Sequence, residues 1–114
     1  MKVEKVNFAR ILVTAGLALS ALCTASVASA ENYTVEINQM RYGSLPANLK
    51  AGDTIVWVNK DLVAHTATAA GLFDSHEIRP DASWTYVANT PGRHAYICTF
   101  HPTMKATLTV KRKP

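Results

Sequence analysis

Three side chains that can bind a metal ion follow one another at three-residue steps near the end of the chain. Cys98, His101 and Met104 stand in the stretch CTFHPTM. In a tight loop, donors spaced in this way can converge on one point, and Pro102 favours such a turn. A thiolate and a thioether suit Cu(I), and imidazole suits both copper oxidation states. The stretch therefore predicts a site for a soft metal ion, and an inert buried thiol is the alternative.

Three ligands do not complete a four-coordinate site, so the other histidines are candidates for the fourth position. These are His65, His76 and His94. His65 follows the connection NKDLVA and opens a short strand-like run, so antiparallel pairing can bring it beside Cys98. We expect His76 in a polar turn and His94 across the core from Cys98. Two imidazoles, a thiolate and a thioether are the ligand set of electron-transfer copper centres, whereas zinc sites seldom include methionine.

The elements that must position these side chains are all strand-like. Alternation of apolar and polar residues predicts strands over residues 33–39, 54–58, 65–69, 83–88, 92–98 and 105–111. Turn-forming residues separate these segments, and no window favours a long amphipathic helix. We therefore expect an all-β fold, a small Greek-key sandwich or barrel. Tyr96 and Cys98 fall on the same face of their strand, and the aromatic ring indicates that this face points into the core.

The first thirty residues are predicted to be a cleaved signal peptide. Basic residues precede an uncharged run, residues 11–30, which ends in Ala28-Ser29-Ala30, a pattern that signal peptidase accepts. A retained membrane anchor is the alternative, because twenty uncharged residues could span a bilayer, although their second half is only weakly apolar. Cleavage would leave residues 31–114 as a single domain in the periplasm, with no membrane contact.

Cleavage would also leave Cys98 as the only cysteine. The chain has two cysteines, and the other one, Cys23, lies in the predicted signal peptide. No intramolecular disulfide is then possible, so Cys98 is a free thiol, half of an intermolecular bridge or a metal ligand. The formal net charge of +4 comes partly from the signal peptide and gives no indication of nucleic-acid binding.

These residues resemble the cupredoxins, the small blue copper proteins, and most closely the amicyanin group among them. The similarity extends over nearly all of residues 33–111. The segment GRHAYICTFHPTM is similar to the strand and loop that carry three of the family's ligands, and its C-x2-H-x2-M spacing is that of the compact amicyanin-type loop. The resemblance implies one copper ion in a type 1 site, cycling between Cu(I) and Cu(II), with His65, Cys98, His101 and Met104 as ligands.

The function that this resemblance implies is electron transfer in the periplasm, without enzymatic activity. The protein would be a monomer that exchanges single electrons with a c-type cytochrome and with a quinoprotein amine dehydrogenase. These partners would dock on an apolar patch near Val63, Ala64, Phe100 and Pro102. A copper-tolerance protein that sequesters or delivers copper is the alternative, and the presence of only three methionines disfavours it.

Two residues depart from the family pattern. Thr66 stands where the family usually has asparagine, whose side chain ties the two ligand loops together, and Phe100 stands where amicyanins usually have proline. The hydroxyl of Thr66 can make a similar hydrogen bond, or the loops can be less firmly tied. Among the other residues, we interpret Met40 as core packing, and Asp53 and Asp61 as turn formers.

Overall fold

The computed structural model describes residues 29–114, together with residues 16, 20 and 22. The predicted signal peptide therefore lies almost entirely outside the described residues. Within the described part of the chain, no helix is long and apolar enough to cross a membrane. The described strands are β1 Asn32–Asn38, β2 Arg41–Tyr42, β3 Asp53–Asn59, β4 Thr68–Ala69, β5 Phe73–Asp74, β6 Ser83–Ala88, β7 Gly92–Ile97 and β8 Lys105–Val110.

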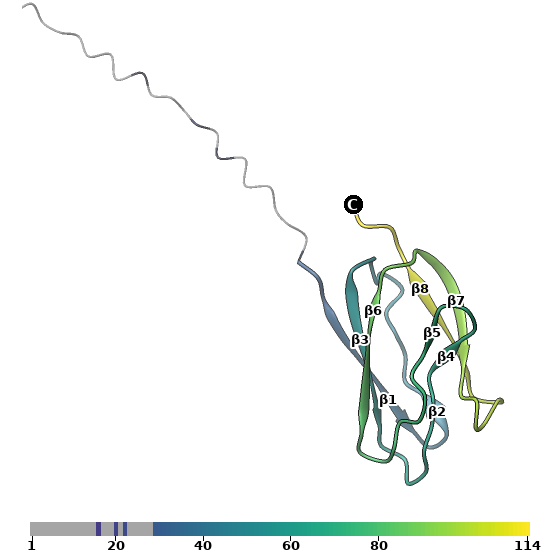
Figure 1. Ribbon diagram of the computed structural model, residues 1–114. Coiled ribbons are helices and arrows are strands. Elements are labelled where there is room, and N and C mark those ends of the chain that lie inside the picture. The colour runs from purple at the N-terminus through teal and green to yellow at the C-terminus, as the bar shows by residue number, and fades with distance from the viewer. Residues whose placement is uncertain (1–15, 17–19, 21, 23–28) are drawn as a thin grey trace, which may run out of the picture.

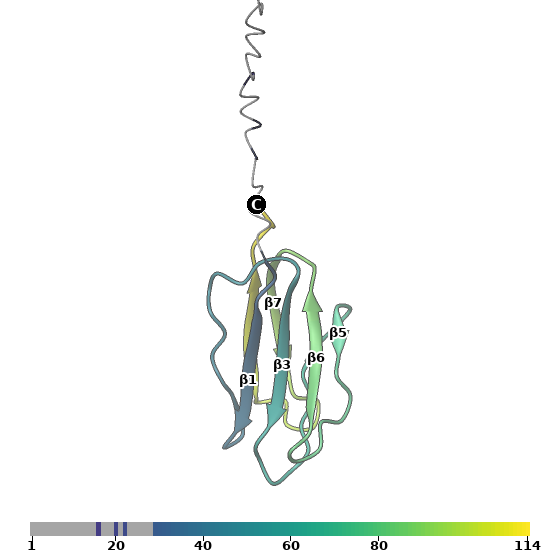
Figure 2. The ribbon, with the colours of Figure 1, turned by 90° about the vertical axis from the view of Figure 1, so that its left-hand side faces the viewer.

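The strands form two four-stranded sheets that pack face to face (Figures 1 and 2). The strand order is β2-β1-β3-β6 in one sheet and β5-β4-β7-β8 in the other. β1 and β3 run parallel, and the other neighbouring strands are antiparallel. The predicted all-β sandwich is therefore confirmed.

The longer strands lie where alternation predicts them, but the shorter ones differ. The predicted strand over residues 65–69 is reduced to β4, and His65 forms an isolated bridge with Ile78. β2 and β5 have two residues each, and the sequence did not predict them. A two-residue strand shows no alternation, so only its pairing with a neighbour defines it.

Aromatic side chains fill the space between the sheets. Trp57 on β3 is fully buried, and its ring lies 5.5 to 5.6 Å from the rings of Phe73, Trp84 and Tyr96. Full burial of one large apolar side chain contributes about 1.5–3 kcal/mol. Tyr96 is buried on the face of β7 that alternation assigned to the core, so this strand carries the chain toward Cys98 from inside the sandwich.

The prediction that Met40 packs in the core is wrong. Its side chain is 42% exposed. Gln39 and Met40 are the two residues of the tight turn between β1 and β2, and both have positive φ, 51° and 59°. Positive φ at both positions is the geometry of a type I′ hairpin turn, which matches the twist of the two strands. The turn thus directs Met40 into solvent and leaves the core to the flanking strands.

The two ends of the sandwich carry different parts of the chain. The loop after β3 (residues 60–64) and the loop between β7 and β8 (residues 98–104) lie at the lower end in Figure 1. Residues 29–31 and the C-terminus lie at the upper end. The predicted metal ligands therefore gather at one end, away from both described termini.

Candidate metal centre

The loop that carries three of the predicted ligands is closed by its own backbone. Cys98 follows the last residue of β7, and its N–H donates to the carbonyl of Met104 (3.2 Å). The N–H of His101 donates to the carbonyl of Cys98 (3.3 Å), and the N–H of Met104 donates to the carbonyl of His101 (2.9 Å). Each three-residue step is therefore one turn of the backbone, as the spacing predicts.

His65 reaches the same end of the sandwich because the loop after β3 is tightly held. Asn59, the last residue of β3, is fully buried, and its amide donates to the carbonyls of Val63 (2.8 Å) and Ile78 (2.9 Å). The backbone N–H of His65 donates to the carbonyl of Ile78 (3.1 Å). The imidazole of His65 is fully buried, so these contacts fix its position before any metal binds.

The three side chains converge on one point. Nδ1 of His65 and Nδ1 of His101 each lie 3.7 Å from Sγ of Cys98, and the three donor atoms lie within 4.8 Å of one another. A metal ion with bonds of about 2.0 Å to nitrogen and about 2.3 Å to sulfur, at an angle of about 120°, separates these atoms by about 3.7 Å. The nitrogen–sulfur distances therefore fit one first-row metal ion between them.

The other two histidines lie elsewhere, as expected. The imidazole of His76 is 86% exposed, 3.7 Å from the carboxylate of Asp74. Nε2 of His94 lies 2.9 Å from the carbonyl oxygen of Thr90, at the end of β7 that is remote from Cys98. Neither side chain approaches the group formed by His65, Cys98 and His101.

Met104 is buried, with 5% of its surface exposed, and it packs within the hydrophobic core. Its backbone bonds to Cys98 and His101 hold it at the end of the ligand loop. The loop therefore brings the methionine backbone to the other two residues of the motif, and ligation by its sulfur stays a prediction.

Asp61 contacts the centre, although the sequence analysis interpreted it only as a turn former. Its Oδ2 lies 2.7 Å from Nε2 of His65. An imidazole that donates a proton from Nε2 to a carboxylate keeps Nδ1 free as an acceptor, and Nδ1 is the atom that faces Cys98. An acidic residue four positions before a predicted ligand was the only sequence signal for this contact.

The same carboxylate also binds the hairpin between β1 and β2. Oδ1 of Asp61 accepts the N–H of Gln39 (2.6 Å), and Oδ2 accepts the N–H of Met40 (2.9 Å). Burial alone would raise the pKa of Asp61, but the hydrogen bonds from Met40, His65 and Gln39 outweigh it and lower this pKa. Asp61 thus joins the hairpin turn to a predicted metal ligand.

The hydroxyl of Thr66 forms a hydrogen bond between the two predicted ligand loops. It accepts the backbone N–H of Thr99 (2.9 Å), which is the residue after Cys98, and it lies 2.9 Å from the hydroxyl of Thr68. The backbone N–H of Thr66 donates to Sγ of Cys98 (3.3 Å). Thr66 is 2% exposed, and with threonine in place of asparagine the two loops are still joined by a partly buried hydrogen bond.

Thr66→Val tests this tie, because valine keeps the shape of the side chain and removes the acceptor. We expect a loss of about 0.5–1.5 kcal/mol in the free energy of unfolding, since the hydrogen bond between the Thr99 N–H and the Thr66 hydroxyl is removed. The metal-loaded variant should also release its metal faster to a chelator. Urea denaturation and stopped-flow release measure the two effects. Thr66→Ser should retain most of both properties, and a serine variant as impaired as the valine variant would contradict the assignment.

Several apolar residues close in sequence to His65 and His101 are exposed. Of the predicted patch, Val63 is 45% exposed and Phe100 is 52% exposed, Pro102 is also exposed, and Ala64 is half-buried. Leu62, which the sequence analysis did not include, is 96% exposed. His101 is half-buried, and its Nδ1 faces the buried thiol of Cys98.

Comparison with known proteins gives the same family from sequence and from structure. A model of the cupredoxin-like domain matches residues 10–110. Amicyanin-alpha of Methylorubrum extorquens is 31% identical over 104 residues, which cover 86% of this chain and 87% of the relative. Amicyanin of Paracoccus versutus is 30% identical over 88 residues, which cover 72% of this chain and 67% of the relative.

Solved structures of amicyanin variants share the fold. The Cu(I) form of a methionine-to-alanine variant has a TM-score of 0.64 at 23% identity, covering 70% of this chain and 82% of the other. The reduced form of a proline-to-phenylalanine variant has a TM-score of 0.64 at 26% identity, with the same coverage.

Proposed function

The chain belongs to the family of cupredoxin-like domains, and from this premise we propose that it is a type 1 copper protein that transfers single electrons between partner proteins. The observation that carries the proposal is the placement of two imidazole nitrogens, each 3.7 Å from the sulfur of a fully buried cysteine. Thiolate and imidazole in this arrangement are the equatorial ligands of an electron-transfer copper site.

The proposed roles of the side chains follow from their positions. Cys98, His65 and His101 would hold the copper ion as equatorial ligands, and Met104 would be the weak axial ligand. The bound ion would supply the one-electron change between Cu(II) and Cu(I). Burial of Cys98 and His65 excludes water from these two side chains, and the backbone bonds of the loop hold Cys98, His101 and Met104 in place. A ligand set fixed in this way needs little rearrangement when the charge of the ion changes.

The same features favour electron transfer over copper delivery. Cys98 and His65 are both fully buried, so release of an ion would require the loops to open. A protein that delivers copper benefits from exposed ligands and fast exchange. The proposed function involves no substrate that is chemically transformed, and we do not propose an enzymatic activity.

We further propose that the partners are redox proteins that dock on an apolar patch beside the centre. The patch near Val63, Ala64, Phe100 and Pro102 is small, as transient electron-transfer interfaces are. A c-type cytochrome and a quinoprotein amine dehydrogenase are the proposed partners of a monomeric protein. We place this exchange in the periplasm, after cleavage of residues 1–30.

The experiment that tests the function is copper loading. Addition of Cu(II) to the purified protein should give one bound ion, an intense thiolate-to-copper band in the visible spectrum and a type 1 EPR signal. A colourless protein with stoichiometric copper would refute the proposal. Rapid loss of the ion to a weak chelator would favour the alternative of copper delivery.

Phe100→Ala tests the docking patch. We expect the second-order rate constant for electron exchange with a c-type cytochrome to fall about tenfold, which corresponds to loss of one important interface contact of about 1.4 kcal/mol. Stopped-flow spectroscopy measures the rate, and the visible band should stay unchanged. Val87→Ala is the matched control, because Val87 is 46% exposed on β6, near the opposite end of the sandwich. Equal rates for the two variants would contradict the assignment.

A further inference from the structure

A buried carboxylate lies at the end of the sandwich opposite the metal centre. Asp53, the first residue of β3, is 3% exposed. Its Oδ2 accepts the backbone N–H of Lys50 (2.7 Å), and its Oδ1 accepts the backbone N–H of Glu31 (2.9 Å). Among the described residues, none of the ion pairs within 4.0 Å includes Asp53. Asp53 therefore has two amide donors and no close cationic partner in the described part of the chain.

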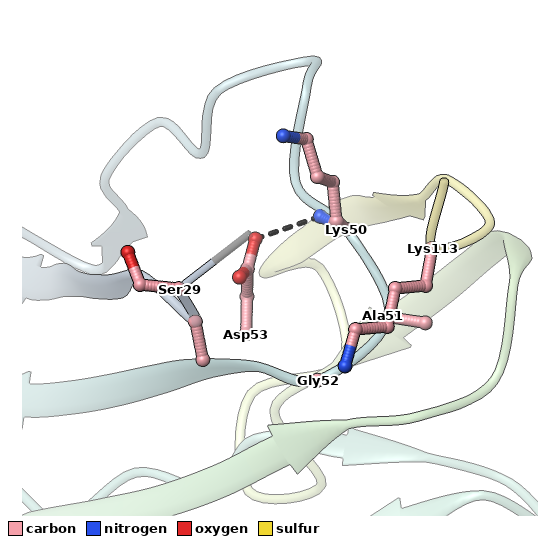
Figure 3. A pocket seen from close by; sticks show the side chains of 7 residues that line it. Ser29, Lys50, Ala51, Gly52, Asp53 and Lys113 are labelled. Atoms are coloured by element: carbon pink, nitrogen blue, oxygen red, sulfur yellow. Dashed lines mark hydrogen bonds between the residues drawn. The ribbon is translucent and has the colours of Figure 1, made fainter. Parts of the chain in front are cut away.

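The carboxylate lines a partly open cavity of about 90 Å³ that is formed by residues from three segments. Figure 3 shows Ser29 on one side of Asp53 and Lys50 and Lys113 on the other, with the hydrogen bond from the Lys50 backbone drawn as a dashed line. Ser29 and Ala30 are lining residues of this cavity, and both belong to the predicted signal peptide. Removal of these two residues would open the cavity beside the nitrogen of Glu31.

The position of this nitrogen is fixed by contacts that do not involve the residues before it. The carbonyl of Glu31 accepts the N–H of Thr54 (2.9 Å), and β1 begins at Asn32, which pairs with Thr54 in the sheet. The nitrogen of Glu31 is thus held 2.9 Å from Asp53 by the start of the β1–β3 ladder. A chain that began at Glu31 would keep the same ladder.

We propose that Asp53 is the receptor for the amino terminus that cleavage after Ala30 creates. Hydrolysis of the Ala30–Glu31 peptide bond consumes one water. Ala30 then ends in a carboxylate, and the new amine of Glu31 takes up the proton that is released. A backbone hydrogen bond to Asp53 then becomes an ammonium–carboxylate ion pair. This inference rests on the proposed cleavage position and does not depend on copper binding.

The charge of Asp53 supports the pair. Burial alone would raise the pKa of Asp53, but hydrogen bonds from the backbone of Glu31 and Lys50, with the charge of Lys50, outweigh it and lower this pKa. Asp53 is therefore ionised at neutral pH. Burial and the charges of Asp53 and Glu31 raise the pKa of Tyr33, so this hydroxyl stays neutral. The side chains of Lys50 and Lys113 border the cavity, and their charges offset part of the attraction between the ammonium and Asp53.

The sign of the pH effect follows from these groups. An ammonium beside an ionised carboxylate has a folded-state pKa above the ordinary α-amino value of about 7.7–8.0, and we expect a rise of about one unit because the two lysines limit it. The extra stability is fully present below about pH 7.7 and is lost as the pH rises through the raised pKa. At acid pH the same extra stability is lost as the pH falls through the lowered pKa of Asp53.

The test compares chains with different amino termini. The described strands and the hydrophobic core lie between residues 32 and 110, so a chain that starts at Glu31 keeps the whole fold. At pH 7 it should have an unfolding equilibrium constant about tenfold smaller than a chain that starts at Ser29, because one pKa unit corresponds to a factor of ten. The difference should vanish at pH 10.

Two further variants isolate the carboxylate and the charge. Asp53→Asn should abolish the difference in stability between the chain that starts at Glu31 and the chain that starts at Ser29. Nα-acetylation of the Glu31 chain should reduce its stability to that of the longer chain. Equal stability of the two starts at pH 7, or a difference that survives acetylation, would overturn the proposal. So would a mass of the full chain, exported with its own leader, that shows a start other than Glu31. The copper band is recorded in parallel, so a failure of the copper assignment is recognised separately.

Discussion

Replacing Cys98 by serine is expected to remove the visible band of the copper-loaded protein completely. The band requires a thiolate bonded to copper, and a serine hydroxyl neither ionises at neutral pH nor provides a soft ligand. The substitution exchanges sulfur for oxygen at a fully buried position, so the fold should be retained. Copper affinity should fall by more than the 10–100-fold that loss of an outer partner of a metal ligand causes.

The measurement combines the visible spectrum with a competition titration against a copper chelator. His94→Gln is the matched control: the residue shares the inward face of β7 with Tyr96, but its imidazole bonds to the carbonyl of Thr90 at the other end of the strand. The control should keep the band and the affinity of the unmodified protein. A Cys98→Ser protein that remains intensely coloured would place the chromophore at another group and remove the basis of the proposed function.

The convergence of Cys98 and His101 could be predicted because spacing and strand alternation are local patterns. The spacing of Cys98, His101 and Met104 corresponds to successive backbone turns, and alternation along β7 orients Cys98 inward. His65 could be proposed because it follows β3 at a strand end, and the structure places its nitrogen beside the thiol. Long strands with regular alternation were found for the same reason, since one face of each is buried.

The residues that support the ligands could not be predicted, because their roles depend on contacts between distant segments. Asp61 bonds to a hairpin turn more than twenty residues earlier in the chain, and no local pattern shows that this turn lies against the loop after β3. Met40 was misplaced for a different reason: the positive φ of the local turn directs its side chain outward. Asp53 is interpreted equally well as a turn former until its buried contact with Glu31 is seen.

Asp61→Ala is expected to weaken both the fold and the metal centre. Gln39 and Met40 have positive φ, a conformation that is unfavourable by about 1–2 kcal/mol for each residue other than glycine. The carboxylate stabilises this turn through two N–H bonds and also binds the buried imidazole of His65. Loss of hydrogen bonds to a charged group should lower the free energy of unfolding by about 2–3 kcal/mol, measured by urea denaturation.

The same variant should release copper more readily while keeping its colour. Asp61 is the hydrogen-bond partner of Nε2 of His65 among the described residues. Without it, no bond in that part of the chain selects the tautomer that leaves Nδ1 free, so copper affinity should fall about 10–100-fold. The thiolate of Cys98 is untouched, and the visible band should persist at saturating copper. Retention of the band with reduced affinity distinguishes a positioning residue from a ligand.

Asp74→Ala separates the two roles of Asp61, because Asp74 also accepts the N–H of a residue with positive φ but makes no contact with a predicted ligand. Its carboxylate accepts the N–H of His76 (2.8 Å), which also has positive φ, and its side chain is 44% exposed. This control should lose stability with no change in copper affinity. If both variants released copper at the rate of the unmodified protein, the bond between Asp61 and His65 would have no role in the centre. If both released it faster, general loosening of the fold would explain the effect, and the imidazole contact would not be required.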